Sequence, residues 1–287
     1  MSKLGLKIKK LIDRSGTVVI ILSAVLVAVV LGYIFSFIIL RGAGALSWEF
    51  LTKPPMDNMT KGGILPAIVG TFYLALISTV ASFPVGLGAG VYLAEYASDN
   101  WFTRLLRSTT RNLAGIPSIV YGIFGVALFV QLSRMGTSLL ASGLTLGLMN
   151  LPWLITTSEE ALRQVPHSYR EGSLALGATK WQTIWKAVLP AALPGILTGM
   201  ILSMSRAAGE TAPILFTGVV FYTPHLPKGL SSQFMALPYH LYILATQHQD
   251  ISGVRPLAYG TALVLIILTF ILNLAAFFIR KKFTLKG

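Results

Sequence analysis

Long apolar runs, separated by short polar segments, are the main pattern along this chain. Each run matches or exceeds the ~20 residues that an α-helix needs to cross a hydrocarbon core roughly 30 Å thick. The second run differs from the others because Pro84 and three nearby glycines interrupt it. The pattern predicts an all-α integral membrane protein with six spanning helices. The runs extend over residues 18–40, 64–94, 113–132, 137–157, 191–220 and 257–279.

The first run follows a basic stretch, so a secretory signal peptide is the alternative to a retained span. Its 23 apolar residues exceed the roughly 7–15 of a signal-peptide core, and no A-x-A cleavage pattern follows it. We therefore expect a retained first span with an outer loop, together covering 18–63. A short cytoplasmic segment (1–17), a core (64–279) and a cytoplasmic tail (280–287) complete the predicted organisation.

Composition supports a membrane location and excludes an ordinary soluble domain. Charged residues make up 11 % of the 287 residues and apolar residues 54 %, whereas soluble domains contain about 25 % charged residues. The net charge of +13 would suggest nucleic acid in a soluble protein. Here the basic residues lie between apolar runs, so we expect no nucleic-acid partner. The sequence has no cysteine, which excludes disulfides and thiolate chemistry.

The uneven distribution of basic residues predicts how the chain is oriented. Lysine and arginine accumulate in the cytoplasmic loops of membrane proteins. With the N-terminus inside, 16 of the 23 lysines and arginines lie in cytoplasmic segments and 6 in outer segments. We therefore expect both termini to be cytoplasmic. The cytoplasmic segments are 1–17, 95–111, 158–190 and 280–287, and the outer ones are 41–63, 133–136 and 221–256.

Two local patterns predict how the helices pack. Glycine pairs four residues apart occur at 86/90, 143/147 and 195/199, and such pairs let helix backbones approach closely in lipid. Packing within one bundle is the favoured interpretation, and contact between subunits is the alternative. In the outer segment 221–256, residues 233–245 are mostly apolar but too few to span, so we expect them in the interface or tucked into the bundle.

The longest predicted cytoplasmic loop, 158–190, has the pattern of two short helices. Residues 171–176 and 178–187 would form them, with Gly177 available for the turn and Pro190 at the start of the fifth span. The second helix carries an apolar stripe beside lysines. An amphipathic helix on the inner leaflet and a docking element for a cytoplasmic partner both fit this stripe. Its members are Trp181, Ile184, Trp185 and Val188.

The same loop resembles a known motif. The segment EGSLALGATKWQTIWKAVLP at 171–190 is similar to the EAA loop of ABC-importer permeases. The glutamate, glycine, leucine and proline of that motif match at the same spacing, whereas Gly172, Ser173 and Ala187 replace its two alanines and its isoleucine. The resemblance implies coupling helices that carry the motion of an ATPase into the membrane. The coupling residues that it implies are Glu171, Gly177, Ala178, Leu189 and Pro190.

Two further stretches, LAGIPSIVYG at 113–122 and SRAAGETAP at 205–213, resemble the phosphate-importer permeases of the PstA type. The resemblance covers most of the chain from about residue 64 to 279. It implies a multi-pass permease of the bacterial inner membrane that imports inorganic phosphate. It also implies three partners: a cytoplasmic ATPase dimer that binds ATP and magnesium, a second, paralogous permease subunit, and an extracytoplasmic phosphate-binding protein. A permease for another oxyanion, such as sulfate or molybdate, is the alternative.

Arg206 and Glu210 are the charged residues that lie deep inside an apolar run. Ions are costly in lipid and usually mark a pathway or a pair. The spacing of four places both on one helix face, with Arg206 about 24 Å along the helix from Pro190. One interpretation is a polar face on the translocation path, where a guanidinium can pair with phosphate oxygens. The other is a self-neutralising pair that fixes helix packing.

Two prolines predict breaks in the spans, one of them beside this charged pair. Pro213 cannot donate to the carbonyl of Gly209, so the fifth span should be weakened there. Pro117 and Ser118 would provide a second break in the third span, which core packing explains equally well. The predicted path residues are Arg206, Glu210, Thr211 and Ser118.

Other chemistry is not indicated. The sequence contains no G-x-x-x-x-G-K-[ST] motif, so we expect no ATP hydrolysis by this chain and no cofactor in it. An intramembrane enzyme with Glu210 as base would lack a paired acid or nucleophile, and an ATP-independent channel would have no use for the loop 158–190. No metal-ligand spacing occurs, and we interpret all four histidines as ordinary loop residues. They are His167, His225, His240 and His248.

Overall fold

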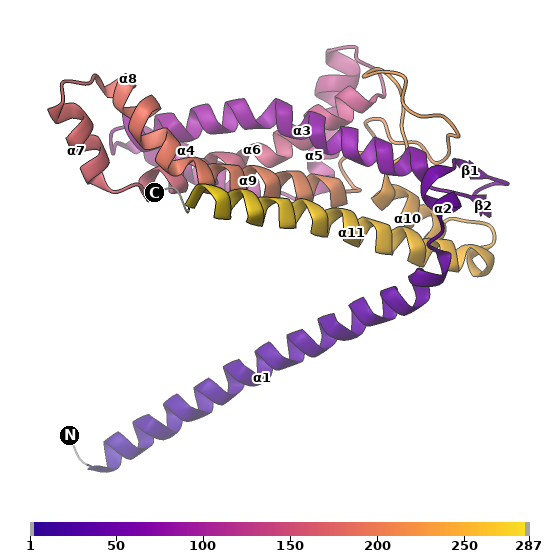
Figure 1. The fold of residues 1–287 in the computed structure, drawn as a ribbon, viewed down its shortest axis with the longest axis horizontal. Coiled ribbons are helices and arrows are strands. Elements are labelled where there is room, and N and C mark those ends of the chain that lie inside the picture. Colours follow the sequence, from indigo (N-terminus) through magenta and orange to yellow (C-terminus); the bar gives the residue numbers. More distant parts are fainter. Residues whose placement is uncertain (1–2, 285–287) are drawn as a thin grey trace.

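The computed structural model describes the backbone of residues 3–284 and the side chains of residues 14–282 except 279. The outermost parts of the predicted segments 1–17 and 280–287 lie outside the described residues. The fold is almost entirely helical, with one small antiparallel sheet (Figure 1). The elements are α1 (Lys3–Gly42), η1 (Ala43–Ala45), α2 (Trp48–Thr52), β1 (Pro55–Met56), β2 (Lys61–Gly62), α3 (Leu65–Val91), η2 (Tyr92–Tyr96), α4 (Trp101–Ala114), α5 (Ser118–Gly125), η3 (Val126–Leu132), α6 (Leu139–Arg163), α7 (His167–Ala175), α8 (Lys180–Thr183), η4 (Ile184–Val188), α9 (Leu189–Gly209), α10 (Leu237–Thr246) and α11 (Ile251–Thr284).

Five rods in the described part of the chain are long and apolar enough to cross a membrane, and a bent pair of helices provides a sixth candidate. In the bent pair, α4 meets the α5–η3 rod at 99°. The break that Pro117 and Ser118 predicted in the third apolar run is therefore present, and the rod that follows it covers 118–132 instead of the whole of 113–132. The chain breaks at residues 115–117 because the residue before a proline is disfavoured in the α conformation, and the helix restarts at Ser118. The five rods are Arg14–Ala45, Leu65–Tyr96, Leu139–Arg163, Lys180–Gly209 and Ile251–Lys282.

Pro84 and the three glycines interrupt the second apolar run in sequence but do not break its helix, because α3 continues through them and passes directly into η2. The glycines serve packing instead. A Cβ on Gly86 would lie 2.7 Å from the Cβ of Leu154, and one on Gly90 would lie 2.5 Å from the Cβ of Ser158. The backbones of α3 and α6 can therefore approach closely only because these positions lack side chains.

The other two glycine pairs are used in the same way. Gly143 and Gly147 of α6 face Ile77 and Ser78 of α3, and Gly195 and Gly199 of α9 face Ala161 and Thr157 of α6. All three pairs thus lie at contacts within one bundle, which confirms the favoured interpretation. The result is a tightly packed group of α3, α6 and α9, against which α11 also packs.

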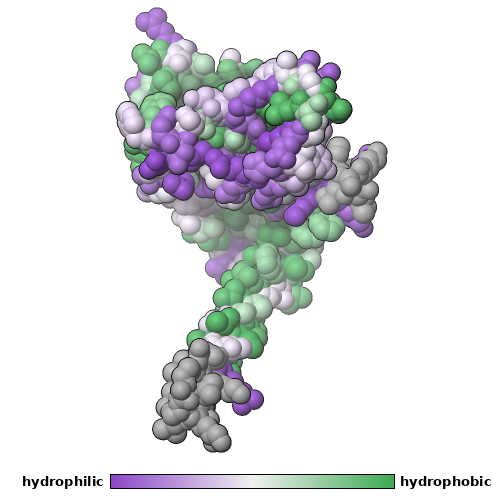
Figure 2. Space-filling view, turned by 90° about the vertical axis from the view of Figure 1, so that its left-hand side faces the viewer, coloured by the Kyte–Doolittle hydropathy of each residue, from purple (hydrophilic) through white to green (hydrophobic). Residues whose placement is uncertain are grey.

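The first helix leaves this bundle as a separate rod (Figure 1). Its contacts lie near its C-terminal end, where the ring of Phe37 meets that of Tyr259 at 5.6 Å and the backbone of Gly42 approaches Tyr259. Both ends of the described chain point to the end of the molecule that carries α7 and α8, here called the α7–α8 end (Figure 1). Viewed from there, most of the bundle surface is hydrophilic, while α1 projects as a mainly hydrophobic rod (Figure 2).

The apolar part of segment 221–256 tucks into the bundle, which is one of its two predicted locations. Phe234 and Leu237 are buried, and the backbone N–H of Leu237 donates to Oγ1 of Thr71 in α3 at 2.8 Å. The short helix α10 follows and packs on α11 and α3. Together with α2 and the β1–β2 hairpin, α10 forms the end of the molecule opposite α7 and α8 (Figure 1).

The interpretation as ordinary loop residues is wrong for three of the four histidines: His167 begins helix α7, and two others are buried. His240 lies on α10 and is buried. His248 is also buried, and its Nε2 lies 2.7 Å from the carbonyl oxygen of Asn58. Both became interior residues because α10 packs inward, which the hydropathy of a ten-residue stretch does not determine.

Candidate functional site

Arg206 and Glu210 meet where α9 ends. The Nε of Arg206 lies 3.4 Å from Oε1 of Glu210, and the two side chains are 49 % and 19 % exposed. The sequence spacing thus brings the two charges together, but only Arg206 is helical. Glu210 is extended, with φ −78° and ψ 135°. The expectation that both residues lie on one face of a helix continuing to residue 220 is therefore wrong.

Pro213 explains where α9 stops. A proline has no N–H, so the carbonyl of Gly209 would lack its intrahelical donor, and the residue before a proline avoids the α conformation. The helix ends at Gly209, and residues 212–218 form turns. Thr217 anchors these turns through a 2.9 Å hydrogen bond between its Oγ1 and the Oγ of Ser142. The predicted weakening is thus confirmed, and it is a complete stop.

The helix α5 packs against the turns that follow Arg206. A Cβ on Gly122 would lie 3.1 Å from the carbonyl oxygen of Ala212, so the glycine permits a close approach. Ser118 begins α5, and both it and Thr211 are partly exposed. Within the described residues, neither hydroxyl makes a hydrogen bond to Arg206 or Glu210. The fold brings α5 to the charged pair without joining the four predicted path residues into one network.

A cavity of about 1070 Å³ opens beside α9 near the α7–α8 end. It lies between α6, α9 and the end of α11. Its lining residues on α9 include Ala191, Gly195, Thr198 and Leu202, which recur at helical spacing along one face. Arg206 follows Leu202 by one further turn. One face of α9 therefore runs from this cavity to the guanidinium.

Segment 158–190 contains two short helices that turn at Gly177, as predicted. Gly177 has φ +81°, a conformation that glycine adopts without steric cost. The Oγ of Ser173 and the Oγ1 of Thr183 lie 2.9 Å apart and tie α7 to α8. The boundaries differ from the prediction, since α6 extends to Arg163 and α7 begins at His167. The second helix continues through η4 into α9, with Pro190 in the first turn of α9.

The predicted apolar stripe divides between two faces. Ile184 and Val188 are 1 % and 0 % exposed and belong to the interior. Trp181 and Trp185 are 58 % and 52 % exposed, with ring centroids 5.4 Å apart. One face of this helix is therefore exposed. Among the other predicted coupling residues, Glu171, Gly177 and Pro190 are exposed, and Ala178 and Leu189 are partly exposed.

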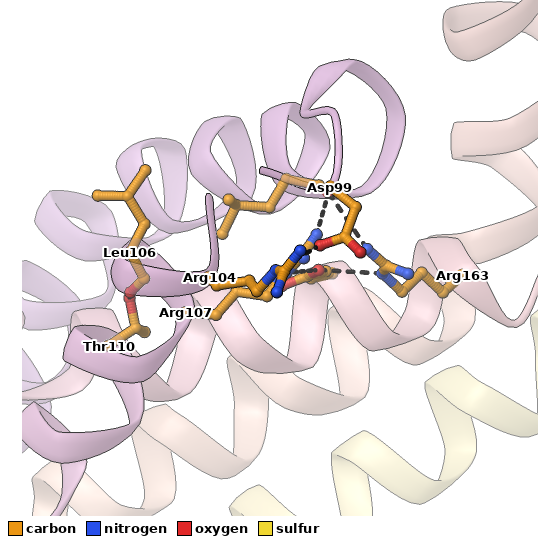
Figure 3. Close-up of polar contacts among 8 residues, drawn as sticks. Asp99, Arg104, Leu106, Arg107, Thr110 and Arg163 are labelled. Carbon is orange, nitrogen blue, oxygen red and sulfur yellow. Dashed lines mark hydrogen bonds and ion pairs between the residues drawn. The ribbon is translucent and has the colours of Figure 1, made fainter. Parts of the chain in front are cut away.

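Sequence reasoning missed a group of ion pairs at the α7–α8 end. Glu159 of α6 accepts from the Nε of Arg107 at 2.8 Å and from the Nε of Arg163 at 2.9 Å. Both arginines also donate to the carbonyl oxygen of Leu93 in η2. Figure 3 shows Arg107 and Arg163 approaching each other from α4 and α6. The spacing of four between Glu159 and Arg163 was the signal available for part of this group.

Known structures share this fold. The chain resembles a subunit of the MetNI methionine ABC transporter in an inward-facing conformation with a TM-score of 0.61 and 18 % identity. The match covers 77 % of this chain and 95 % of that one. A bacterial ABC transporter for import of the acidic polysaccharide alginate gives a TM-score of 0.57 at 15 % identity, covering 90 % and 95 % of the two chains.

Curated relatives are similar over nearly the whole length. A "Probable ABC transporter permease protein YqgI" of Bacillus subtilis is 35 % identical over 280 residues, covering 93 % of this chain and 95 % of that protein. The "Phosphate transport system permease protein PstA 1" of Mycobacterium tuberculosis is 34 % identical over 281 residues, covering 96 % and 91 %. The model of the family "Binding-protein-dependent transport system inner membrane component" matches residues 86–284. The chain therefore belongs to this family and is a permease of the ABC-transporter type.

Proposed function

We propose that the chain is the permease subunit of an ATP-driven phosphate importer. The observation that supports this proposal most directly is the position of Arg206. Its side chain is half-exposed and lies at the end of the α9 face that begins in the cavity. A guanidinium offers five N–H donors in a fixed fork that matches phosphate oxygens. The phosphate transport permease of Mycobacterium tuberculosis, similar over 96 % of this chain, supports phosphate as the substrate.

In this proposal, phosphate passes along the α9 face between Arg206 and the cavity. Glu210 holds the guanidinium when phosphate is absent, and its negative charge keeps binding of a dianion weak enough for release. Thr211 and Ser118 lie on the segments that meet beside the pair and contribute hydroxyl groups to the path. The stop of α9 at Gly209 frees backbone groups next to the path, as in other transporters with broken helices.

The proposed energy source lies outside this chain. A cytoplasmic ATPase dimer, holding ATP and magnesium, would contact the exposed side of segment 158–190. Trp181 and Trp185 give this surface two adjacent aromatic anchors, the residue type that dominates binding energy at interfaces. Glu171, Gly177, Ala178, Leu189 and Pro190 complete the proposed coupling segment. The permease itself would carry out no chemical reaction.

Two further partners are proposed, a second permease and an extracytoplasmic phosphate-binding protein. Two permease proteins of Bacillus subtilis, YqgI and YqgH, are 35 % and 33 % identical to this chain. Two related permeases in one organism favour a paralogous pair over a homodimer.

The binding protein would dock at the end formed by α2, β1–β2 and α10. The basic residues of the α7–α8 end favour a cytoplasmic location of that end and of both termini, in the bacterial inner membrane.

The direct test is phosphate-stimulated ATP hydrolysis and phosphate uptake by the complex purified through this subunit. Sulfate and molybdate serve as competing ions. Hydrolysis and uptake that respond to phosphate alone are the expected result. A complex that contains an ATPase but responds to sulfate or molybdate instead would replace the substrate and keep the permease role.

A further inference from the structure

The last turn of the α3 rod touches both short helices of segment 158–190. This turn is η2, which continues α3 without a break. Glu95 of η2 pairs with Arg170 of α7. The ring of Tyr96 lies 4.8 Å from the Nζ of Lys180, the first residue of α8. In sequence, α3 is separated from α7 by three helices, so these side chains attach it to α7 and α8 directly.

Arg170 is the centre of this attachment. Its Nε lies 3.2 Å from each carboxylate oxygen of Glu95, and its Nη2 also donates to that carboxylate. Its Nη1 donates to the carbonyl oxygen of Val165 at 2.8 Å, and its Nη2 donates to that of Leu162 at 2.9 Å. The side chains of Arg170 and Glu95 are 17 % and 7 % exposed. One guanidinium therefore joins the ends of α3 and α6 to the first turns of α7.

This arrangement needs an arginine and a carboxylate. The last carbonyls of a helix lack intrahelical donors. Arg170 gives the carbonyl of Leu162 a donor in addition to the N–H of Val165, and it also donates to the carbonyl of Val165 just beyond α6. A planar guanidinium can serve two carbonyls and a carboxylate together, whereas the compact ammonium of lysine cannot match this fork. Removing either charge would leave the other poorly solvated and unpaired.

The two ends of segment 158–190 are connected to the spans differently. At one end, α8 and η4 continue into α9 as an unbroken helix. At the other end, residues 164–166 join α6 to α7 without helical structure. A displacement of α7 would be absorbed by this connection unless side chains fix α7 to the helices behind it. Arg170 and Glu95 supply that fixation.

We propose that the Arg170–Glu95 pair makes α7, α6 and α3 move as one body when an ATPase displaces the α7–α8 surface. The inference rests on the proposed function, because it requires that ATP hydrolysis drives transport through this surface. Arg170 and Glu95 are positioning residues in this mechanism. They touch neither phosphate nor ATP, and their role is to prevent motion from being lost at residues 164–166. The Lys180–Tyr96 contact holds α8 to the same turn of α3.

The test compares phosphate uptake with ATP hydrolysis in the same proteoliposomes, which contain the complete complex. In Glu95→Gln and Arg170→Lys, hydrolysis should stay close to that of the wild type. The phosphate transported per ATP should fall about fivefold or more, the range of coupling between distant sites. Asp99→Asn is the matched control, because Asp99 pairs with Arg104 at the same end but on the exposed surface. The phosphate transported per ATP by Asp99→Asn should equal that of the wild type.

A second measurement separates coupling from folding. The chain has no cysteine, so Glu95→Cys and Arg170→Cys introduce the only two cysteines of this subunit, and a short bifunctional methanethiosulfonate can bridge them by forming one disulfide with each thiol. Bridging should raise the phosphate transported per ATP, and reductive cleavage of the bridge should lower it again. Equal ratios with and without the bridge, or a wild-type ratio in Glu95→Gln, would overturn the inference. Failure of the wild-type complex to transport phosphate would instead overturn the proposed function.

Discussion

The Nε of Arg206 lies 3.4 Å from a carboxylate oxygen of Glu210, although the helix that carries Arg206 ends between the two residues. The arginine is therefore held by a rigid helix and the glutamate by an irregular segment. Glu210 thus lies outside helix α9, whereas Arg206 lies on the α9 face that leads to the cavity.

Replacing Arg206 by alanine should abolish phosphate uptake and leave assembly with the ATPase intact. The guanidinium supplies the phosphate-binding donors in the proposed path, and its side chain is half-exposed, so the bundle does not depend on it. Uptake of radioactive phosphate by vesicles and copurification of the ATPase measure the two effects. Normal uptake by the alanine variant would remove Arg206 from the path.

The two faces of the helix formed by α8 and η4 should respond differently to truncation. Trp181→Ala combined with Trp185→Ala removes exposed rings, so the thermal stability of the isolated subunit should not change while ATPase copurification is lost. Ile184→Ala should instead lower the free energy of unfolding by about 2–5 kcal/mol, because this side chain is buried. Full retention of the ATPase by the double tryptophan variant would contradict the proposed docking surface.

Two glycines of α3 provide a matched test of the packing with α6. A Cβ on Gly90 would lie 2.5 Å from the Cβ of Ser158 and 3.0 Å from the backbone N of Glu159. Gly90→Ala should therefore destabilise the subunit by about 1–3 kcal/mol, as overpacking does. Gly88 has open space, so Gly88→Ala should be neutral or stabilising by up to about 1 kcal/mol. Thermal unfolding in detergent measures both, and equal effects would show that α3 and α6 do not pack this closely.

The turn between α7 and α8 should depend on the backbone of Gly177 and not on space around it. A Cβ there would meet nothing within 4 Å, but φ is +81°. Gly177→Ala should therefore cost about 1–2 kcal/mol through the left-handed backbone alone and weaken binding of the ATPase. Gly172→Ala is the control, because Gly172 is equally open but lies within α7. Titration of the purified permease with the ATPase compares the two, and equal affinities would argue against a structured turn.

Several features of the fold followed from sequence because they depend on local chemistry. Apolar runs of sufficient length predicted the membrane rods, and the glycine pairs predicted close helix contacts. The missing N–H of Pro213 predicted the disturbance at Gly209, and Gly177 predicted the turn between the short helices. Each of these depends on properties of a few neighbouring residues, so no knowledge of distant segments was required.

Other features were decided only by the tertiary structure. Glu95 and Arg170 are 75 residues apart, and Arg107 and Glu159 are 52 apart, so no local pattern identifies either pair. The apolar stripe of α8 and η4 was visible in the sequence, but which two of its four residues face outward depends on where α6 and α9 lie. The hydropathy of a residue indicates that its side chain prefers an apolar environment. Which of these side chains are buried depends on how helices distant in sequence pack together.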